Sequence, residues 1–228
     1  MKSAHTRPSN VKKRILSEAV RLFAENGYEG TSVQAVAEAV GIKNPSLLYY
    51  FKSKEQLREA VLDDMLSHWK DELPRLISQS TTSQDRFGSL VESVVGFFAE
   101  DKNRARLTIR EMLDNPTYIG AQIKTHLGPW IQLISDYINM GKKSGIIRPE
   151  IDPERYIFQI ILIVAGTLAL SDVTTQILGE TDDSTRGPAE GIVRAARDIL
   201  FVNSYRTYLE RENGKSQQRP GKRKAASG

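Results

Sequence analysis

The sequence predicts an all-α protein of about nine to ten helices, with a small N-terminal three-helix domain in front of a larger C-terminal helical bundle. Apolar residues recur at helical spacing along most of the chain, and no stretch shows the strict alternation typical of a β-strand. Glycine and proline residues divide these stretches at positions that suit helix ends. With 228 residues, 39% of them hydrophobic, the chain can bury a core in one large or two modest domains.

The N-terminal domain begins with a helix predicted over residues 10–26, which Gly27 ends. Thr31 and Gln34 form a predicted capping box at the start of a second helix, which carries an apolar stripe at helical spacing. Gly41 suits the left-handed position that follows the last turn of that helix.

A very short third helix is predicted to follow at once. Asn44 is suited to cap it, and Pro45 suits its first position, where no amide hydrogen is needed. Ser53 and Gln56 form a second capping box, so that a longer helix starts almost without a gap. Two short helices joined by a tight turn predict a helix-turn-helix, the motif that lays its second helix in the major groove of DNA.

The run GIKNPSLLYYFKSKEQL, residues 41–57, resembles the N-terminal signature of the TetR family of transcriptional regulators. The resemblance covers about residues 11–60 in detail and rests on helix layout and length beyond them. It implies that the short helix and its flanks contact double-stranded DNA, at a palindromic operator. Leu48 departs from the pattern, because many relatives have a DNA-contacting tyrosine at this position. The implied contact residues are Thr31, Lys43, Asn44, Pro45, Ser46, Tyr49, Tyr50 and Lys54.

The charge of the chain is distributed unevenly. Its net charge is only +4, but residues 1–54 hold nine Lys or Arg against four acidic residues, or +5. Residues 213–228 hold five Lys or Arg and no acidic residue, another +5, which leaves −6 for the body of the chain. A polyanionic partner for the N-terminal part follows more naturally from this distribution than a membrane surface does.

Residues 1–52 are expected to form the DNA-binding domain and residues 53–212 a ligand-binding and dimerisation domain. Residues 213–228, basic and without large apolar side chains, are expected to be a disordered tail. Pro74 is expected to end or kink the first helix of the bundle, and Gly128 with Pro129 to divide a later one. The helices expected in the bundle are 53–72, 84–100, 104–113, 116–127, 130–144, 153–179 and 188–212.

The helix expected over residues 153–179 is apolar on nearly every side. A helix of this kind must be buried on every side, and one protomer offers too few partners to do so. A homodimer built through this helix and the last helix is therefore expected, with the same patch used on both subunits.

The resemblance to the TetR family also implies a pocket for a small, mostly apolar effector inside the bundle. Arg110 and Glu111 are candidates to bind a polar group of that ligand, although a structural ion pair explains them at least as well. The aromatic candidates are also consistent with plain core packing. The candidate pocket residues are Phe87, Phe98, Leu107, Arg110, Glu111, Trp130, Tyr137, Phe158 and Leu162, with Met112 as a further wall.

Composition and motifs exclude other classes of protein. The chain has no cysteine, so disulfides, thiolate catalysis and cysteine-based zinc sites are excluded. His68 and His126 lack metal-ligand spacing, and the common nucleotide-binding and nucleophile motifs are absent, so no enzyme activity, metal or cofactor is expected. No secretory signal is seen, and the longest apolar run is shorter than the ~20 residues of a membrane span. A cytoplasmic protein without a membrane partner is expected.

The expected function is that of a sequence-specific transcriptional regulator, a repressor that a small-molecule ligand releases from its operator. An activator or a nucleoid-associated DNA-binding protein without such a switch would have the same first domain. A small-molecule carrier built on the bundle would not need that domain. An enzyme built on the bundle should lose turnover when a pocket residue is changed, and the sequence points to no such residue.

Overall fold

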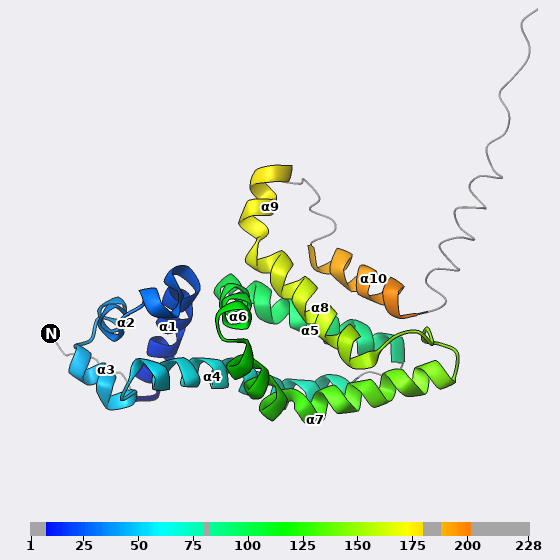
Figure 1. Cartoon of the computed structure of the whole chain (residues 1–228), viewed down its shortest axis with the longest axis horizontal. Helices are drawn as coiled ribbons and strands as arrows, with labels where there is room; N and C mark the ends of the chain where they lie inside the picture. The colour runs from blue at the N-terminus through cyan, green and yellow to red at the C-terminus, as the bar shows by residue number, and fades with distance from the viewer. Residues whose placement is uncertain (1–7, 80–82, 180–187, 202–228) are drawn as a thin grey trace, which may run out of the picture.

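The computed structural model describes residues 8–79, 83–179 and 188–201, and every regular element within these ranges is a helix. This confirms the all-α class, whereas the tail expected at 213–228 lies outside the described residues. Figure 1 shows α1, α2 and α3 at one end of an elongated molecule, with α4 running from them into the bundle. The helices are α1 (Pro8–Gly30), α2 (Val33–Val40), α3 (Asn44–Tyr50), α4 (Lys54–Gln79), α5 (Ser83–Glu100), α6 (Lys102–Asp114), α7 (Pro116–Lys143), α8 (Pro153–Ala169), α9 (Ser171–Leu178) and α10 (Pro188–Leu200).

The three N-terminal helices close around a small apolar core. Ile15 of α1, Val36 of α2 and Leu47 of α3 are fully buried, and Leu57 carries the same core into α4. Arg14 of α1 donates from Nη2 to the carbonyl oxygen of Val40 over 2.6 Å, which satisfies one of the orphan carbonyls at the end of α2. The helices α1, α2 and α3 are thus packed against the first turns of α4.

The turn of the helix-turn-helix and the start of α4 are built as expected. Gly41 adopts the left-handed conformation, with φ 75° and ψ 35°, and its N–H reaches the carbonyls of the last turn of α2. The Oγ of Ser53 accepts a hydrogen bond from the Gln56 N–H at 3.1 Å. The Gln56 side chain in turn accepts one from the Lys52 N–H at 2.6 Å.

The caps expected at the starts of α2 and α3 are wrong by one residue. Ser32, not Thr31, caps α2, because its Oγ accepts a hydrogen bond from the backbone N–H of Ala35 at 3.0 Å. Lys43, not Asn44, is the N-cap residue of α3 and makes no side-chain cap bond. Asn44 therefore lies in the first turn of α3, ahead of Pro45.

The expected division of α7 at Gly128 and Pro129 is wrong, because α7 runs unbroken from Pro116 to Lys143. A proline inside a helix costs about 3 kcal/mol, so packing on both sides of Pro129 must offset this cost. Leu127 and Trp130 flank the pair and both pack against the hydrophobic core. α4 likewise continues past Pro74 to Gln79.

The apolar helix expected over residues 153–179 is instead two helices, α8 and α9, bent by 62°. Asp172 of α9 pairs with Arg106 of α6 at 2.5 Å and with Lys102 at 3.4 Å. These pairs lie at the start of α9, which projects from the bundle (Figure 1). Within the described ranges no single helix is long and apolar enough to cross a membrane, although α8 and α9 taken together reach that length and composition.

Gly41 provides a test of the turn. Gly41→Ala places a Cβ on left-handed backbone, so we expect the free energy of unfolding to fall by about 1–2 kcal/mol. Nothing lies within 4 Å of the added Cβ, so the effect is one of backbone conformation. Gly120→Ala on α7, also in open space, is the matched control and should raise stability by about 0.5–1 kcal/mol. Urea denaturation measures both, and a neutral Gly41→Ala would contradict the left-handed turn.

Candidate DNA-binding surface and ligand cavity

The short helix α3 carries most of the residues expected to contact DNA. Leu47 is fully buried and Phe51 nearly so, and together they hold the inner side of α3 on the core. Lys43, Pro45 and Ser46 are exposed at its start. The exposed side of α3 therefore carries a cationic group and a hydroxyl group at its N-terminal end.

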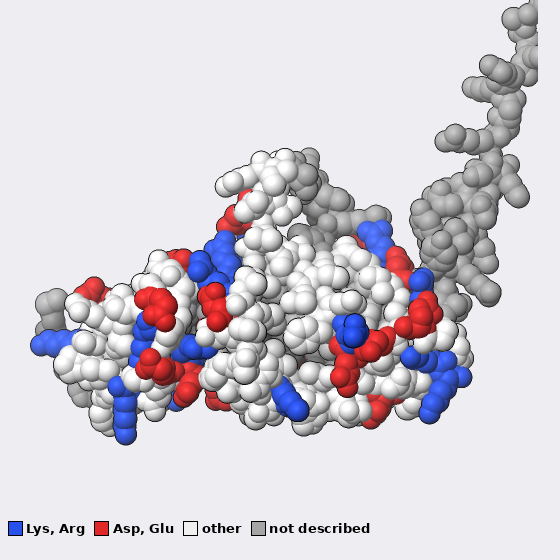
Figure 2. Space-filling model, viewed as in Figure 1, with Lys and Arg blue, Asp and Glu red and all other residues white. Residues whose placement is uncertain are grey.

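Two tyrosines stand at the other end of α3. Tyr49 is 84% exposed, and its ring meets that of Tyr50 edge-on, with centroids 5.5 Å apart. Leu48, at the position where the expected pattern has a tyrosine, is exposed. Figure 2 shows Lys and Arg side chains projecting from this end of the molecule. An aromatic, partly cationic surface of this kind suits base edges and phosphates of a duplex.

Thr31 does not lie on this surface. It is 2% exposed, and its Oγ1 donates to the carbonyl oxygen of Gly27 at 2.8 Å and lies 3.0 Å from that of Leu22. The Thr31 hydroxyl, implied to contact DNA, is instead committed to the end of α1. The exposed hydroxyl at this place belongs to Ser32, whose Oγ is the cap of α2.

Lys54 and Asn44 are only partly available. The Nζ of Lys54 lies 4.1 Å from the ring centre of Tyr28 and 3.9 Å from a carboxylate oxygen of Glu29. The Oδ1 of Asn44 is out of contact with solvent and has no hydrogen-bond partner among the described residues. For both residues a contact with DNA remains a prediction.

The helices α1, α2 and α3 together form the recognition end of the molecule. A buried ion pair joins this end to the bundle, at the place where α1, α4, α6 and α7 meet. Arg58 of α4 donates to Oε2 of Glu111 of α6 from Nε, at 3.1 Å, and its Nη2 lies 2.8 Å from the same oxygen. The guanidinium lies between two rings, with its Cζ 5.0 Å from the ring centre of Tyr28 and 4.6 Å from that of Tyr118. The Tyr28 hydroxyl donates to Glu55 at 2.6 Å.

The electrostatics of this cluster follow from its burial. Glu111 is 3% exposed, and burial raises the pKa of its carboxyl, with the Arg58 guanidinium opposing that shift. Burial, together with the hydrogen bond to Glu55, raises the pKa of Tyr28 to about 12. The pair therefore costs desolvation as well as gaining attraction, and either member alone would be a poorly solvated charge.

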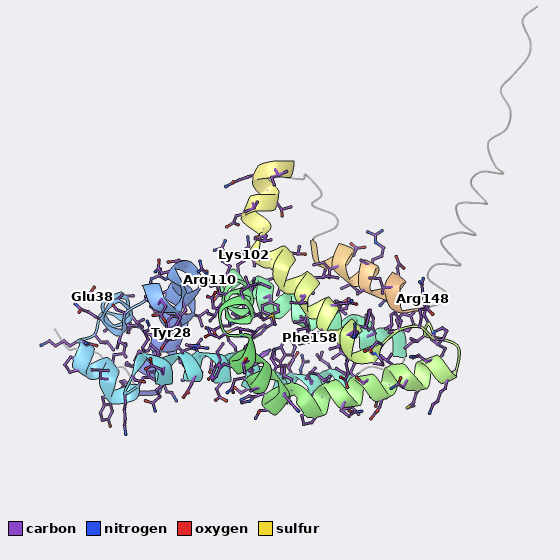
Figure 3. The ribbon with its side chains drawn as sticks, viewed as in Figure 1. Tyr28, Glu38, Lys102, Arg110, Arg148 and Phe158 are labelled. Atoms are coloured by element: carbon purple, nitrogen blue, oxygen red, sulfur yellow. The ribbon has the colours of Figure 1, made fainter. Side chains whose placement is uncertain are left out.

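A second contact between the two parts of the chain lies beside this pair. Arg110 of α6 donates from Nη2 to the carbonyl oxygen of Glu25 at 3.2 Å. Gly27 has φ 75°, and a Cβ built on it would lie 3.1 Å from the Arg110 guanidinium. A glycine thus bends α1 and leaves room for the arginine. Figure 3 shows Arg110 and Tyr28 where the N-terminal helices meet α6.

An apolar cavity of about 170 Å³ lies inside the bundle, between α4, α5, α6, α7 and α8. Two hydroxyl groups occur in its wall. That of Tyr156 donates to the carbonyl oxygen of Ala196 at 2.7 Å, and that of Thr108 donates to the carbonyl oxygen of Arg104 at 2.8 Å. Both are satisfied within the protein, so the cavity presents an almost wholly apolar surface.

The structure brings four of the nine candidate pocket residues to this cavity: Phe87, Phe98, Trp130 and Phe158, with Met112 beside them. The other five lie elsewhere. Leu107 is buried in the core, and Tyr137 and Leu162 are exposed on the outer sides of α7 and α8. Arg110 and Glu111 turn toward α1 and α4 instead of toward the cavity, since position along α6 sets the side that each residue occupies.

Residues of α4 and α7 that line the cavity were missed by sequence reasoning. α4 contributes Leu62, Met65, Leu66, Trp69 and Leu73, and α7 contributes Ile119, Ile123, Leu127, Ile131, Ile134 and Ile138. Their helical spacing signals a buried face but does not distinguish a cavity wall from close-packed core. Among the described residues, no group of three His, Asp or Glu side chains is placed to hold a metal ion.

The arrangement matches known proteins over most of the chain. Residues 15–61 match the family model for bacterial regulatory proteins of the tetR family, and residues 84–190 match a tetracyclin repressor-like C-terminal domain. The chain is 30% identical over 175 residues to the HTH-type transcriptional regulator RutR of Escherichia coli (strain K12), covering 77% of this chain and 80% of RutR. The chain belongs to the TetR family. It is a DNA-binding transcriptional regulator.

The chain is also similar in sequence to a second regulator and in fold to a third. The chain is 25% identical over 154 residues to the HTH-type transcriptional repressor KstR2 of Mycolicibacterium smegmatis, covering 64% of this chain and 72% of KstR2. The crystal structure of FadR from Bacillus subtilis in complex with stearoyl-CoA has the same fold, with a TM-score of 0.61 at 19% identity. That comparison covers 83% of this chain and 97% of FadR.

The ion pair between α4 and α6 can be tested by removing one or both charges. Glu111→Met leaves the Arg58 guanidinium buried without its partner, so we expect the free energy of unfolding to fall by about 3–5 kcal/mol. The double replacement by Met at both positions should recover most of that loss, since no buried charge remains. Arg21→Met, which removes an exposed pair with Glu18, is the control and should change stability by less than about 1 kcal/mol. Urea denaturation distinguishes the cases, and equal losses in the single and double variants would contradict the buried-charge account.

Proposed function

We propose that this regulator represses transcription as a homodimer and that an apolar small molecule bound in the bundle releases it from its operator. The observation that carries the proposal is the apolar cavity, because its wall includes α4 and α6, the two helices that hold the recognition end. The similarity to KstR2, an HTH-type transcriptional repressor, supports the same direction of control. The protein would act in the cytoplasm, where the operator DNA is.

The chemistry of the cavity supports an uncharged ligand, or the apolar part of a larger one. A carboxylate placed inside would lose its hydration, and the described residues of the wall include no Lys, Arg or His side chain to pair with it. Both hydroxyls of the wall are already bonded to backbone carbonyls. FadR in complex with stearoyl-CoA has the same fold, and an acyl chain belongs to the class of ligand that this cavity suits.

A homodimer is supported by the outer side of α8. Tyr156, Ile160 and Val164 are buried within the protomer, whereas Leu162 and Ile163 on the other side of the helix are exposed. A second copy meeting this face through a two-fold axis would cover both sides of the helix. It would also place two α3 helices on one duplex, where successive major grooves are about 34–36 Å apart.

The switch would act through α6 as well as through α4. Thr108 and Met112 of α6 line the cavity, while Arg110 and Glu111 of the same helix contact Glu25 and Arg58. A ligand that displaces α6 would therefore shift the recognition end and alter the separation of the two α3 helices. Moving the dimer from 99% to 1% competent takes about 5.5 kcal/mol of differential binding, which two sites in a dimer would divide between them.

DNA contact can be tested with two exposed residues of the α3 surface. Lys43→Ala should weaken binding to all DNA about equally and reduce the salt slope by about one ion, because a phosphate contact carries no sequence information. Tyr49→Ala should cost about 1–3 kcal/mol at the selected operator and less on unrelated DNA. Lys124→Ala, exposed on α7 in the bundle, is the control and should change neither. If Tyr49→Ala lost the same binding free energy on operator and on unrelated DNA, Tyr49 would not take part in base recognition.

Ligand release can be tested by reciprocity. Ligand that copurifies with the protein from cells is identified by mass spectrometry and titrated calorimetrically with and without saturating operator. Operator DNA should weaken ligand binding by the factor by which ligand weakens operator binding. Equal affinities in both titrations would leave a regulator without this switch. Transcription from the operator with and without the protein separates repression from activation.

A further inference from the structure

Two cations of α4 lie against one aromatic ring of α1. The Nζ of Lys54 lies 4.1 Å from the centre of the Tyr28 ring, and the Cζ of Arg58, one turn further along α4, lies 5.0 Å from it. Arg58 is neutralised by Glu111, whose Oε2 lies 2.8 Å from its Nη2. Lys54 has a weaker partner, since its Nζ lies 3.9 Å from a carboxylate oxygen of Glu29. Of the two cations, Lys54 is therefore the one that can accept another anion.

The side chain of Lys54 is more covered than is usual for a lysine at a protein surface. It is 21% exposed, whereas the side chain of Glu29 is 94% exposed and keeps nearly all of its water. A carboxylate that remains hydrated attracts a neighbouring ammonium only weakly. The face of an aromatic ring attracts a cation through the negative charge of its π system, and it does so more strongly as water is removed. The Tyr28 ring therefore fixes the position of the Lys54 ammonium more firmly than Glu29 does.

The position of the Tyr28 ring is itself fixed at both ends. Gly27, with φ 75° and ψ 172°, interrupts α1 just before Tyr28. The buried Thr31 hydroxyl donates to the Gly27 carbonyl oxygen at 2.8 Å, and the Thr31 N–H donates to the Tyr28 carbonyl oxygen at 3.2 Å. At the far end of the side chain, the Tyr28 hydroxyl donates to Glu55 of α4 at 2.6 Å. Figure 3 shows Tyr28 between α1 and the beginning of α4.

We infer that Tyr28 is a positioning residue for DNA binding, whose ring holds the Lys54 ammonium where it meets a phosphate of the duplex. Lys54 begins α4 only four residues after Tyr50 ends α3, so the ammonium is held close to the expected recognition helix. A lysine that moves freely loses side-chain freedom when it contacts a phosphate, and this loss weakens binding. A lysine that a ring already holds has lost that freedom before it meets DNA. The inference rests on the predicted contact between Lys54 and DNA, and it needs no contact between Tyr28 and DNA.

The test compares changes at Tyr28 with a change at Lys54. The probe is a fluorescein-labelled DNA duplex selected from a random pool by binding to the wild-type protein, and its affinity is measured by anisotropy over a range of salt concentrations. Lys54→Met removes the charge and should reduce the salt slope by about one ion for each subunit bound. Tyr28→Leu should weaken binding about fivefold and shift the salt slope in the same direction. Tyr28→Phe, which keeps the ring, should bind within about twofold of the wild type.

A double variant and a fluorinated ring separate positioning from a loss of structure. In the Lys54→Met background, Tyr28→Leu should have no further effect on affinity, because no ammonium is left to hold. A merely structural role of Tyr28 would weaken binding by the same factor in both backgrounds. Tyr28→pentafluorophenylalanine keeps the size of a Phe ring but reverses its quadrupole, so it should fold as Tyr28→Phe does and bind DNA as weakly as Tyr28→Leu.

Tyr118 provides the matched control. Within the described residues its ring meets Arg58, at 4.6 Å, and not Lys54. Tyr118→Leu should therefore lower stability, as Tyr28→Leu does, without changing the affinity or the salt slope. Circular dichroism checks that each variant is folded at the temperature of the binding experiment.

The outcomes distinguish this inference from the proposed function. Equal losses for Tyr28→Leu with and without the Lys54 charge overturn the positioning role. The same follows if the fluorinated ring binds DNA as well as Tyr28→Phe does, or if Tyr118→Leu weakens binding as much as Tyr28→Leu. If Lys54→Met changes neither the affinity nor the salt slope, the predicted phosphate contact is wrong and the inference fails with it. In each of these cases the proposed repressor and its ligand switch are unaffected.

Discussion

One buried ion pair lies at the centre of the contact between the recognition end and the bundle. Arg58 and Glu111 come from α4 and α6, and the guanidinium lies between rings of α1 and α7, so four helices meet at a single charge. A charge with so little contact with water has few alternatives to its partner, because separating the pair without solvating it costs several kcal/mol. The contact is therefore close to all-or-none. A displacement of α6 either carries α4 with it or breaks the pair, and this gives a small movement in the bundle a defined consequence at α3.

Local sequence signals predicted the recognition end well. The left-handed Gly41, the buried inner side of α3 and the capped start of α4 are all set within a few residues. The wrong caps at Thr31 and Asn44 have different causes. At α3 the N-cap residue is Lys43, which makes no side-chain cap bond, so the polar residue of the motif did not mark the start of the helix. At α2 tertiary burial decided the cap, since Thr31 is drawn into the end of α1 and Ser32 caps the helix instead. The continuity of α7 through Pro129 was missed for the same reason, because packing on either side outweighs local propensity.

The candidate site was less predictable because it is made by distant residues. Arg58 and Glu111 are 53 positions apart, and nothing in either local sequence pairs them. The spacing along α6 placed Arg110 and Glu111 beside apolar neighbours, but not on which side of the helix the cavity would lie. The aromatic candidates fared better, since four of them line the cavity, because large apolar side chains inside a bundle have few other places to go.

Two helices of the bundle, α6 and α8, each contribute side chains to the cavity and to at least one other surface. α6 has Met112 on the cavity, Glu111 on the recognition end and Arg106 against α9. α8 has Val164 in the core, Ile161 on the cavity and Leu162 on the outside. In a helix, neighbouring residues point in directions about 100° apart, so one rigid element presents several faces that must move together. Close packing makes such an element shift as a unit instead of deforming locally. Under the proposed function, coupling between the cavity, the proposed dimer face and the DNA surface follows from the division of α6 and α8 into faces, without a dedicated path of residues between the sites.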